Sequence, residues 1–232
     1  QILQGSLELY TNQNFDKNNY NLVFNSNPVY FNIIPRNLYI TPILTTKIYA
    51  DNDPAQFTYS YSNLAVGEIP AFSGVLGRET GENVGSYSVT LNSLTLQNNL
   101  AQTQTQKNFF ATNYNLVLQN AQDKFKITKR NLVITPTANQ SKVFGEQDPT
   151  FSFSYSNNAL GEIPNFSGSL TRILGEDAGN YNYLLGTLEI VSTGTLQSGN
   201  YNLALNAENV YFAITYGVLN ADNNASDGTA EN

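Results

Sequence analysis

The sequence lacks cysteine, histidine, methionine and tryptophan altogether. Without Cys and His, the common zinc, haem and iron–sulfur sites have none of their usual ligands. The Ser-His-Asp and Cys-His catalytic arrangements are excluded for the same reason. Disulfides cannot form either, although a cysteine-free chain is compatible with secretion, because it cannot mispair outside the cell.

Charge is also sparse. Only 12% of the 232 residues are charged, with a formal net charge of −7. An acidic chain without a basic stripe is poorly suited to bind nucleic acid or an anionic membrane surface. No apolar run approaches the roughly 18 residues that a membrane span needs, and no signal peptide is visible. We therefore expect no nucleic-acid partner and no membrane insertion. Because the chain starts at Gln1, we expect it to be processed or partial material.

Internal repetition is the dominant pattern in what remains. Residues 37–42 (NLYITP) return 94 positions later as 131–136 (NLVITP), and 67–74 (GEIPAFSG) return as 161–168 (GEIPNFSG). The NYNL sequence at 113–116 returns only 87 positions later, at 200–203. The seven lost positions fall in a loop, 97–112 in the first copy and 191–199 in the second. A change of length confined to a loop is what a fixed β framework tolerates.

The N-terminal residues follow the same pattern. Residues 5–9 (GSLEL) match 186–190 (GTLEI), and 19–22 (NYNL) match 200–203, both 181 positions apart. The sequence therefore predicts the C-terminal half of a truncated repeat over 1–36 and complete repeats over 37–130 and 131–216. Residues 217–232 match no repeat, and their Asn, Asp, Ser and Gly content indicates a linker or tail.

Within a repeat, the hydrophobic pattern has a period of two. Residues 57–62 (FTYSYS) and 151–156 (FSFSYS) alternate aromatic with small polar side chains, as a strand with one buried face does. We expect strands near 38–41, 47–49, 56–62, 72–78, 86–91, 93–96, 113–118 and 123–128. Short strands at this density, without an amphipathic helix, predict an all-β fold of tandem Ig-like β-sandwich repeats. The alternative is a β-grasp-like repeat with one short helix.

These residues resemble the MBG domain of the YGX type. The matching features are the Ile-Thr-Pro strand, the segments 47–51 (KIYAD) and 142–146 (KVFGE), Asp-Pro at 53–54 and 148–149, Phe-Ser-Gly, and Gly-Glu-x-x-Gly-x-Tyr. The resemblance covers 37–216 fully and 1–36 in part. Each copy departs once from Tyr-Gly-x, with Ala50 in place of the glycine and Phe144 in place of the tyrosine. A residue with a Cβ disfavours positive φ, so Ala50 argues against a special turn in the first repeat.

The resemblance implies a place in tandem arrays of very large secreted and surface proteins of bacteria, notably Bacteroidota. Such repeats are similar to spacer and adhesion modules, some of them linked to gliding motility and type IX secretion. The family brings no catalytic residues, and the implied location is extracellular, at the bacterial cell surface. No catalytic, cofactor-binding or metal site is predicted, and no cofactor is expected.

Several residues have both a functional and an ordinary structural interpretation. The acids Glu82, Glu176 and Asp177 could in principle form a catalytic pair, but Glu82 and Glu176 occupy equivalent turns of two repeats. We expect them to pair instead with Arg78 and Arg172. The aromatic strand could stack on sugars, but core packing explains it better. Calcium could bind Asp51, Asn52 and Asp53, or Asp222, Asn224 and Asp227; solvated turn acids are the simpler interpretation of both sets.

The sequence therefore predicts a structural stalk or spacer segment of a large extracellular bacterial adhesin or surface filament. Its expected partners are neighbouring repeats of the same chain, with cell-surface proteins or glycans as further candidates. One alternative is a carbohydrate- or surface-ligand-binding module that acts through loops 97–112, including the polar stretch 101–107, and 191–199. Another is a strand-exchanged subunit of a polymer, in which the N-terminal strands complete the sheet of another chain. An enzyme is not expected.

Overall fold

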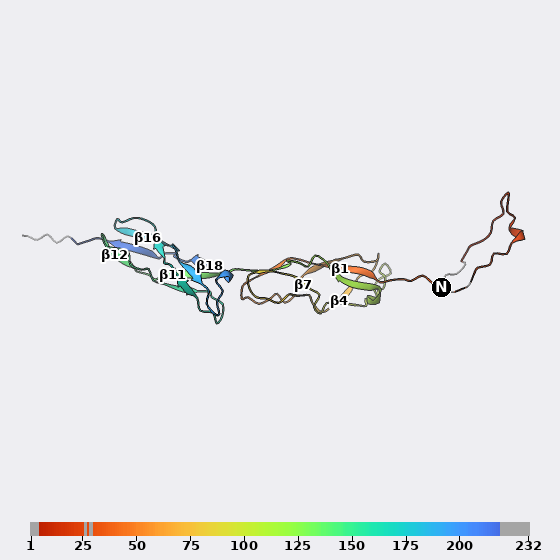
Figure 1. The fold of residues 1–232 in the computed structure, drawn as a ribbon, viewed down its shortest axis with the longest axis horizontal. Helices are drawn as coiled ribbons and strands as arrows, with labels where there is room; N and C mark the ends of the chain where they lie inside the picture. The colour runs from red at the N-terminus through yellow and green to blue at the C-terminus, as the bar shows by residue number, and fades with distance from the viewer. Residues whose placement is uncertain (1–4, 26, 28–29, 219–232) are drawn as a thin grey trace, which may run out of the picture. The chain divides into compact units, whose positions relative to one another are not determined.

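The computed structural model describes residues 5–25, 27 and 30–218, and it is all-β, as the sequence predicts (Figure 1). Its only helical pieces are three 3-10 turns, η1 (Lys17–Asn19), η2 (Ala111–Asn113) and η3 (Ser198–Asn200). The described ranges contain no α-helix, so the short helix of the β-grasp alternative is not found in them. No helix in these ranges is long and apolar enough to cross a membrane.

The chain divides into two compact units. Unit 1 comprises 1–40, 61–74 and 94–118, and unit 2 comprises 41–60, 75–93 and 119–232. We call residues 36–129 repeat 1 and residues 130–216 repeat 2, because the first strand of each begins at Arg36 and at Arg130. The division runs through repeat 1, whereas repeat 2 lies wholly in unit 2.

Repeat 2 is built from two main sheets and a two-stranded sheet. The sheets have the strand orders β13-β11-β18 and β12-β19-β16-β15, and β14 pairs with β17. The first strand pairs in parallel with β18, from Arg130↔Tyr201 to Ile134↔Leu205, and the last strand pairs in parallel with β12. The strands are β11 (Arg130–Pro136), β12 (Ser141–Val143), β13 (Phe153–Ser156), β14 (Asn165–Ser167), β15 (Thr171–Arg172), β16 (Gly179–Leu184), β17 (Glu189–Val191), β18 (Tyr201–Leu205) and β19 (Tyr211–Thr215).

Side chains from both sheets of repeat 2 meet in one core. Ile134 of β11 is fully buried, as is Phe212 of β19, and both belong to a cluster with Phe151 and Tyr183. The Phe151 ring lies 5.3 Å from the ring of Tyr183 and 5.0 Å from that of Phe212, with edge contacts that aromatic pairs favour. Alternate residues of each strand point to this core, which is the origin of the period-two pattern.

Repeat 1 has the same order of elements, except that two strands, β6 and β7, stand where repeat 2 has the single strand β16. Its strands form the sheets β3-β1-β9 and β2-β10-β6 and the pairs β4-β8 and β5-β7. They are β1 (Arg36–Pro42), β2 (Thr45–Ile48), β3 (Tyr59–Ser62), β4 (Ala71–Ser73), β5 (Gly77–Arg78), β6 (Gly85–Tyr87), β7 (Val89–Thr90), β8 (Thr95–Gln97), β9 (Tyr114–Leu118) and β10 (Phe125–Thr128). The segment expected as one strand over 72–78 is two strands, because Gly74 between them has a φ of 79°. β1 is parallel to β9, and β10 to β2, as in repeat 2.

The N-terminal segment keeps one feature of the repeat. The turn η1 precedes Tyr20 as η2 precedes Tyr114 and η3 precedes Tyr201. However, Phe31 and Ile33 are 69% and 88% exposed, whereas Phe125 and Ile127, their counterparts in β10, are 0% and 2% exposed. β10 lies between β2 and β6 in its sheet, whereas within the described ranges no strand pairs with residues 30–34.

Candidate functional site

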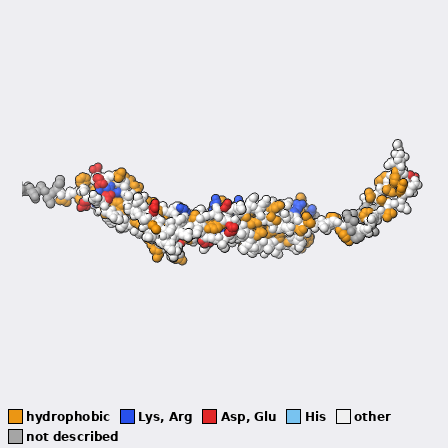
Figure 2. Space-filling model, in the orientation of Figure 1, with side chains coloured by type: hydrophobic (Ala, Val, Ile, Leu, Met, Phe, Trp, Pro, Cys, Tyr) orange, Lys and Arg blue, Asp and Glu red, His pale blue; other side chains and the backbone are white. Residues whose placement is uncertain are grey.

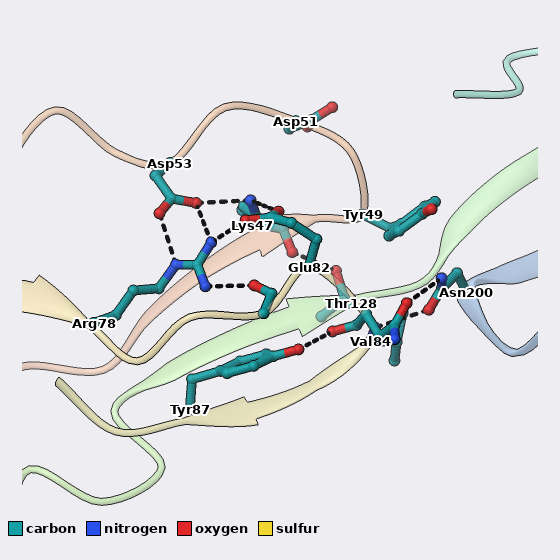
Figure 3. Close-up of polar contacts among 12 residues, drawn as sticks. Lys47, Tyr49, Asp51, Asp53, Arg78, Glu82, Val84, Tyr87, Thr128 and Asn200 are labelled. Carbon is teal, nitrogen blue, oxygen red and sulfur yellow. Dashed lines mark hydrogen bonds and ion pairs between the residues drawn. The ribbon is translucent and has the colours of Figure 1, made fainter. Parts of the chain in front are cut away.

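Four charged side chains form a cluster at one end of repeat 1 (Figure 3). The ammonium of Lys47 lies 2.7 Å from Asp53 and 2.5 Å from Glu82. Arg78 donates from Nε to Asp53 at 2.6 Å and from a terminal nitrogen to Glu82. Each acid thus binds both cations. The predicted pairing of Arg78 with Glu82 is confirmed, and the structure adds Lys47 and Asp53.

Repeat 2 contains the same cluster. Asp148 pairs with Lys142 at 2.8 Å and with Nε of Arg172 at 2.7 Å, and Glu176 binds both cations as well. The predicted pairing of Arg172 with Glu176 is therefore confirmed. The sequence signal for the missing members was present, because Lys and Asp-Pro recur in both repeats at the same spacing.

The cations of these clusters are buried and the acids face solvent. The side chains of Lys47 and Arg78 are 5% and 8% exposed, against 38% and 60% for Asp53 and Glu82. The Arg78 guanidinium also lies 4.7 Å from the centre of the Phe125 ring, a cation–π contact with the core. On the face that Figure 2 shows, blue and red side chains lie near one another on a largely white and orange surface.

The electrostatics of the clusters argue against acid–base chemistry. Hydrogen bonds from Arg78 lower the pKa of Asp53, and those from Arg172 lower the pKa of Asp148. A general acid needs the opposite shift, since it must hold a proton near neutral pH. The arrangement fixes one end of each repeat.

A glycine turn supports each cluster. Gly81 has a φ of 141°, and a Cβ on it would lie 2.4 Å from the ring of Tyr87. The Tyr87 hydroxyl donates to the carbonyl of Asn83 at 2.6 Å, and the Gly81 carbonyl accepts from Arg78 at 2.5 Å. Gly175 and Tyr181 repeat this geometry. The Gly-Glu-x-x-Gly-x-Tyr motif is therefore a structural turn that places its glutamate beside the cations.

The end of repeat 1 contacts the beginning of repeat 2, within unit 2. Strand β10 ends at Thr128 and β11 begins at Arg130, so a single residue connects them. The Arg130 guanidinium donates to the Tyr49 carbonyl at 2.8 Å and pairs with Asp51. It also donates to the side-chain oxygen of Asn157 at 3.0 Å.

Glu162 of repeat 2 joins a tyrosine from each repeat. Its carboxylate accepts hydrogen bonds from the hydroxyls of Tyr49 and Tyr201, the latter at 2.5 Å. The two rings lie 5.5 Å apart in an edge contact. Burial, together with the hydrogen bond to Glu162, raises the pKa of Tyr201 to about 12. Both phenols therefore remain donors at neutral pH.

Asn200 completes the contact (Figure 3). Its side chain is 3% exposed, accepts from the backbone N–H of Val84 at 2.9 Å and donates to Asn83 at 3.0 Å. We call the contacts of Arg130, Asn157, Glu162, Asn200 and Tyr201 with residues 49–51 and 83–84 the junction. The sequence analysis assigned none of these residues a role.

A comparison with family models identifies the repeats. The model described as "MBG domain (YGX type)" matches residues 38–122 and 132–211, two tandem copies. The chain belongs to the MBG domain family. A search of the curated proteins and a search of the solved structures give no match. MBG domains are repeat modules found in surface proteins, a family not known as enzymatic.

The YGX sequence of the MBG domain forms the turn that enters the junction. Tyr49, Ala50 and Asp51 follow β2, and the Asp51 N–H donates to the carbonyl of Ile48 at 3.1 Å. Ala50 has a φ of 64°, as in a type II turn, whose third residue needs positive φ. Gly145 takes the same position in repeat 2, with a φ of 88°. The argument from Ala50 against a special turn in repeat 1 was wrong, because the surrounding contacts hold the backbone at positive φ despite its Cβ.

Two of the residues considered for calcium, Asp51 and Asp53, have protein partners in the MBG repeats. Asp51 pairs with Arg130, and Asp53 binds Lys47 and Arg78. In the described ranges, no group of three His, Cys, Asp or Glu residues could hold a metal ion. Asp222, Asn224 and Asp227 lie outside the described residues. Asp177 contributes its carbonyl, which accepts from Tyr181 at 2.7 Å.

The aromatic strand of each MBG repeat is only partly in the core. Phe57 and Phe151 are 8% and 6% exposed, as core packing predicts. Tyr61 and Tyr155, four residues later, are 48% and 40% exposed and lie against Phe72 and Phe166. Burial therefore decreases along the segment. The polar loop 101–107 closes on itself, with the Gln102 N–H donating to the side chain of Gln106 at 2.9 Å.

Proposed function

We propose that this chain is a stiff spacer segment of a large extracellular bacterial surface protein, in which MBG repeats hold other parts of that protein away from the cell. The observation that carries the proposal is the junction, where repeat 1 and repeat 2 share the carboxylate of Glu162 and the guanidinium of Arg130. Membership of a family of repeats found in surface proteins supports it.

The connection between the repeats gives the physical reason for stiffness. One residue links β10 to β11, so the linker cannot act as a flexible coil. Arg130, at the start of β11, is held at once by the ladder of repeat 2 and by the carbonyl of Tyr49. Charge-assisted hydrogen bonds are stronger than neutral ones, and the junction contains several. A bend between the repeats would break them together.

Spin-label distance measurements test the proposal. The chain has no cysteine, so single cysteines introduced at the exposed residues Gln56 and Ser154 can carry the labels. We expect one narrow distance distribution for the full chain. Glu162→Gln should broaden it, because an amide nitrogen cannot accept from a tyrosine hydroxyl. Glu208→Gln, which replaces an exposed acid outside the junction, should leave it narrow. A broad distribution in the unmodified chain would refute stiffness.

A second candidate function rests on the N-terminal segment. Phe31 and Ile33 are exposed where repeat 1 buries their counterparts, which is the pattern of a strand that lacks its partners. In a polymer, strands of another chain would cover them by strand addition. Sedimentation of the full chain and of a chain without residues 1–35 tests this: assemblies formed only by the full chain support exchange, and monomers of both exclude it.

A further inference from the structure

The beginning of repeat 1 carries a second copy of the surface through which repeat 2 contacts repeat 1 at the junction. The Tyr114 hydroxyl donates to Glu68 at 2.8 Å and accepts from the Ala65 N–H at 2.9 Å. In repeat 2, Tyr201 makes the same pair of bonds with Glu162 and Ala159. The two arrangements differ in that Tyr49 has joined the second one.

The arginine of this surface is also repeated. Arg36 donates to the side chain of Asn63 at 3.5 Å, as Arg130 donates to Asn157 at 3.0 Å. Arg130 has a further acid and a carbonyl from the preceding repeat as partners. Arg36 is exposed. One residue, Pro35, separates it from residues 31–34, the counterpart of β10, just as one residue separates Arg130 from β10.

The exposure of one asparagine distinguishes the surface of repeat 2, which contacts repeat 1, from the matching surface of repeat 1. Asn200 is 3% exposed under the turn of repeat 1, whereas Asn113, its counterpart, is exposed. A hollow of about 460 Å³ lies at this place, lined by residues that include Arg36, Glu68, Asn113 and Tyr114. The side chain of Tyr49 takes the equivalent place in repeat 2, beside Tyr201.

We propose that Arg36, Glu68, Asn113 and Tyr114 form a preformed docking socket for the end of a further MBG repeat, one with tyrosine at the position of Tyr49 and an acid at that of Asp51. The inference rests on the proposed spacer function and adds the partner and its recognition residues. The phenol donates to Glu68, the acid pairs with Arg36, and a backbone N–H of the Gly-Glu-x-x-Gly turn donates to Asn113.

The far end of repeat 2 does not meet this description. Phe144 stands in the tyrosine position and has no hydroxyl, so it leaves an acceptor of the socket unused. Glu146, in the acid position, already accepts from the N–H of Val143 at 3.0 Å. A second copy of this chain would therefore fit the socket less well than a repeat of the Tyr49 type. The socket thus selects its neighbour by a single phenol and a single free acid.

The socket can be tested with the full chain carrying a second copy of residues 36–129 inserted after Lys129, so that both a duplicated and the native junction are present. The Tyr49 end of the first copy then precedes the Arg36 socket of the second. With labels at Gln56 of the first copy and Ser60 of the second, the pair matches Gln56 and Ser154 of the unmodified chain. We expect a distribution as narrow as that of the unmodified chain. Glu68→Gln in the second copy should broaden it, whereas Glu208→Gln should not.

The outcomes separate the two proposals. A narrow distribution across the native junction with a broad one across the duplicated junction overturns the socket and leaves the spacer function standing. A broad native distribution overturns the spacer function itself. A Glu68→Gln chain that stays narrow also overturns the socket, provided that circular dichroism shows an unchanged fold. Concentration-dependent dimers of the unmodified chain that Glu68→Gln abolishes would identify the Phe144 end as occupant and overturn selection by the phenol.

Discussion

The turn at Ala50 allows a quantitative prediction, because the two repeats have different residues, Ala50 and Gly145, at the same turn position. Ala50 has a φ of 64°, a region that costs a residue with a Cβ about 1–2 kcal/mol. Glycine avoids that cost but loses about 0.4–1 kcal/mol through its freer unfolded chain. Ala50→Gly should therefore raise the free energy of unfolding by about 0.5–1 kcal/mol.

The reverse change in repeat 2 should have the opposite sign. A Cβ on Gly145 would meet no atom within 4 Å, so the backbone conformation is the main cost. Gly145→Ala should lower the free energy of unfolding by about 0.5–1 kcal/mol. Ala121→Gly, at a residue without positive φ, is the control and should be destabilising.

Native-state hydrogen exchange read by mass spectrometry can measure these changes, because it reports the opening free energy of each repeat separately. Urea denaturation followed by circular dichroism gives the overall change. If Ala50→Gly destabilises repeat 1, or Gly145→Ala stabilises repeat 2, the turn at these positions is not strained by its Cβ and the reasoning fails.

Three further predictions concern the charged clusters and the junction. The pKa of Asp148 is lowered from its ordinary value of 3.8, so its stabilising effect is present above about pH 4 and is lost as the pH falls through the folded-state pKa. Thermal melts should therefore show Tm falling in this acid range. Asp148→Asn should lower Tm at pH 7 and make Tm depend less on pH in acid. Arg172→Met should reduce the free energy of unfolding in urea by about 1–3 kcal/mol, less than for a fully buried pair because the acids reach solvent; an unchanged midpoint would contradict the ion-pair account. Tyr201 should ionise near pH 12 in absorbance titrations, and Tyr201→Phe should remove this ionisation from the titration curve. The stabilising effect of Tyr201 is present below about pH 10 and is lost as the pH rises towards 12.

The sequence was most informative where a pattern repeats locally. Period-two alternation located most strands to within a few residues, although the segments expected as single strands over 72–78 and 86–91 are each two strands. The i, i+4 spacing of Arg78 and Glu82 was enough to predict their ion pair. The 94-residue shift gave the tandem arrangement that the family match confirms. These features depend on neighbours along the chain, which the sequence displays directly.

The junction could not be predicted in the same way. Tyr49 and Glu162 are 113 positions apart, and nothing in their local sequence indicates a shared hydrogen bond. Lys47 was also missed, since an alternating pattern tells which face a residue occupies but not its partner on another strand. At Ala50 the local preference was overridden by the β2 ladder on one side and Arg130 on the other, which together hold the turn.

The parallel pairing of the outer strands bears on how a repeat responds to mechanical force. In repeat 2 the chain enters through β11, which is bonded along its length to β18, and leaves through β19, which is bonded to β12. Tension applied at the two ends of the repeat therefore pulls each of these strands along its own axis. The ladder bonds are loaded in shear and must yield together, unlike the bonds of a hairpin, which can open one at a time. A surface protein exposed to flow would gain resistance to unfolding from this topology, without a disulfide.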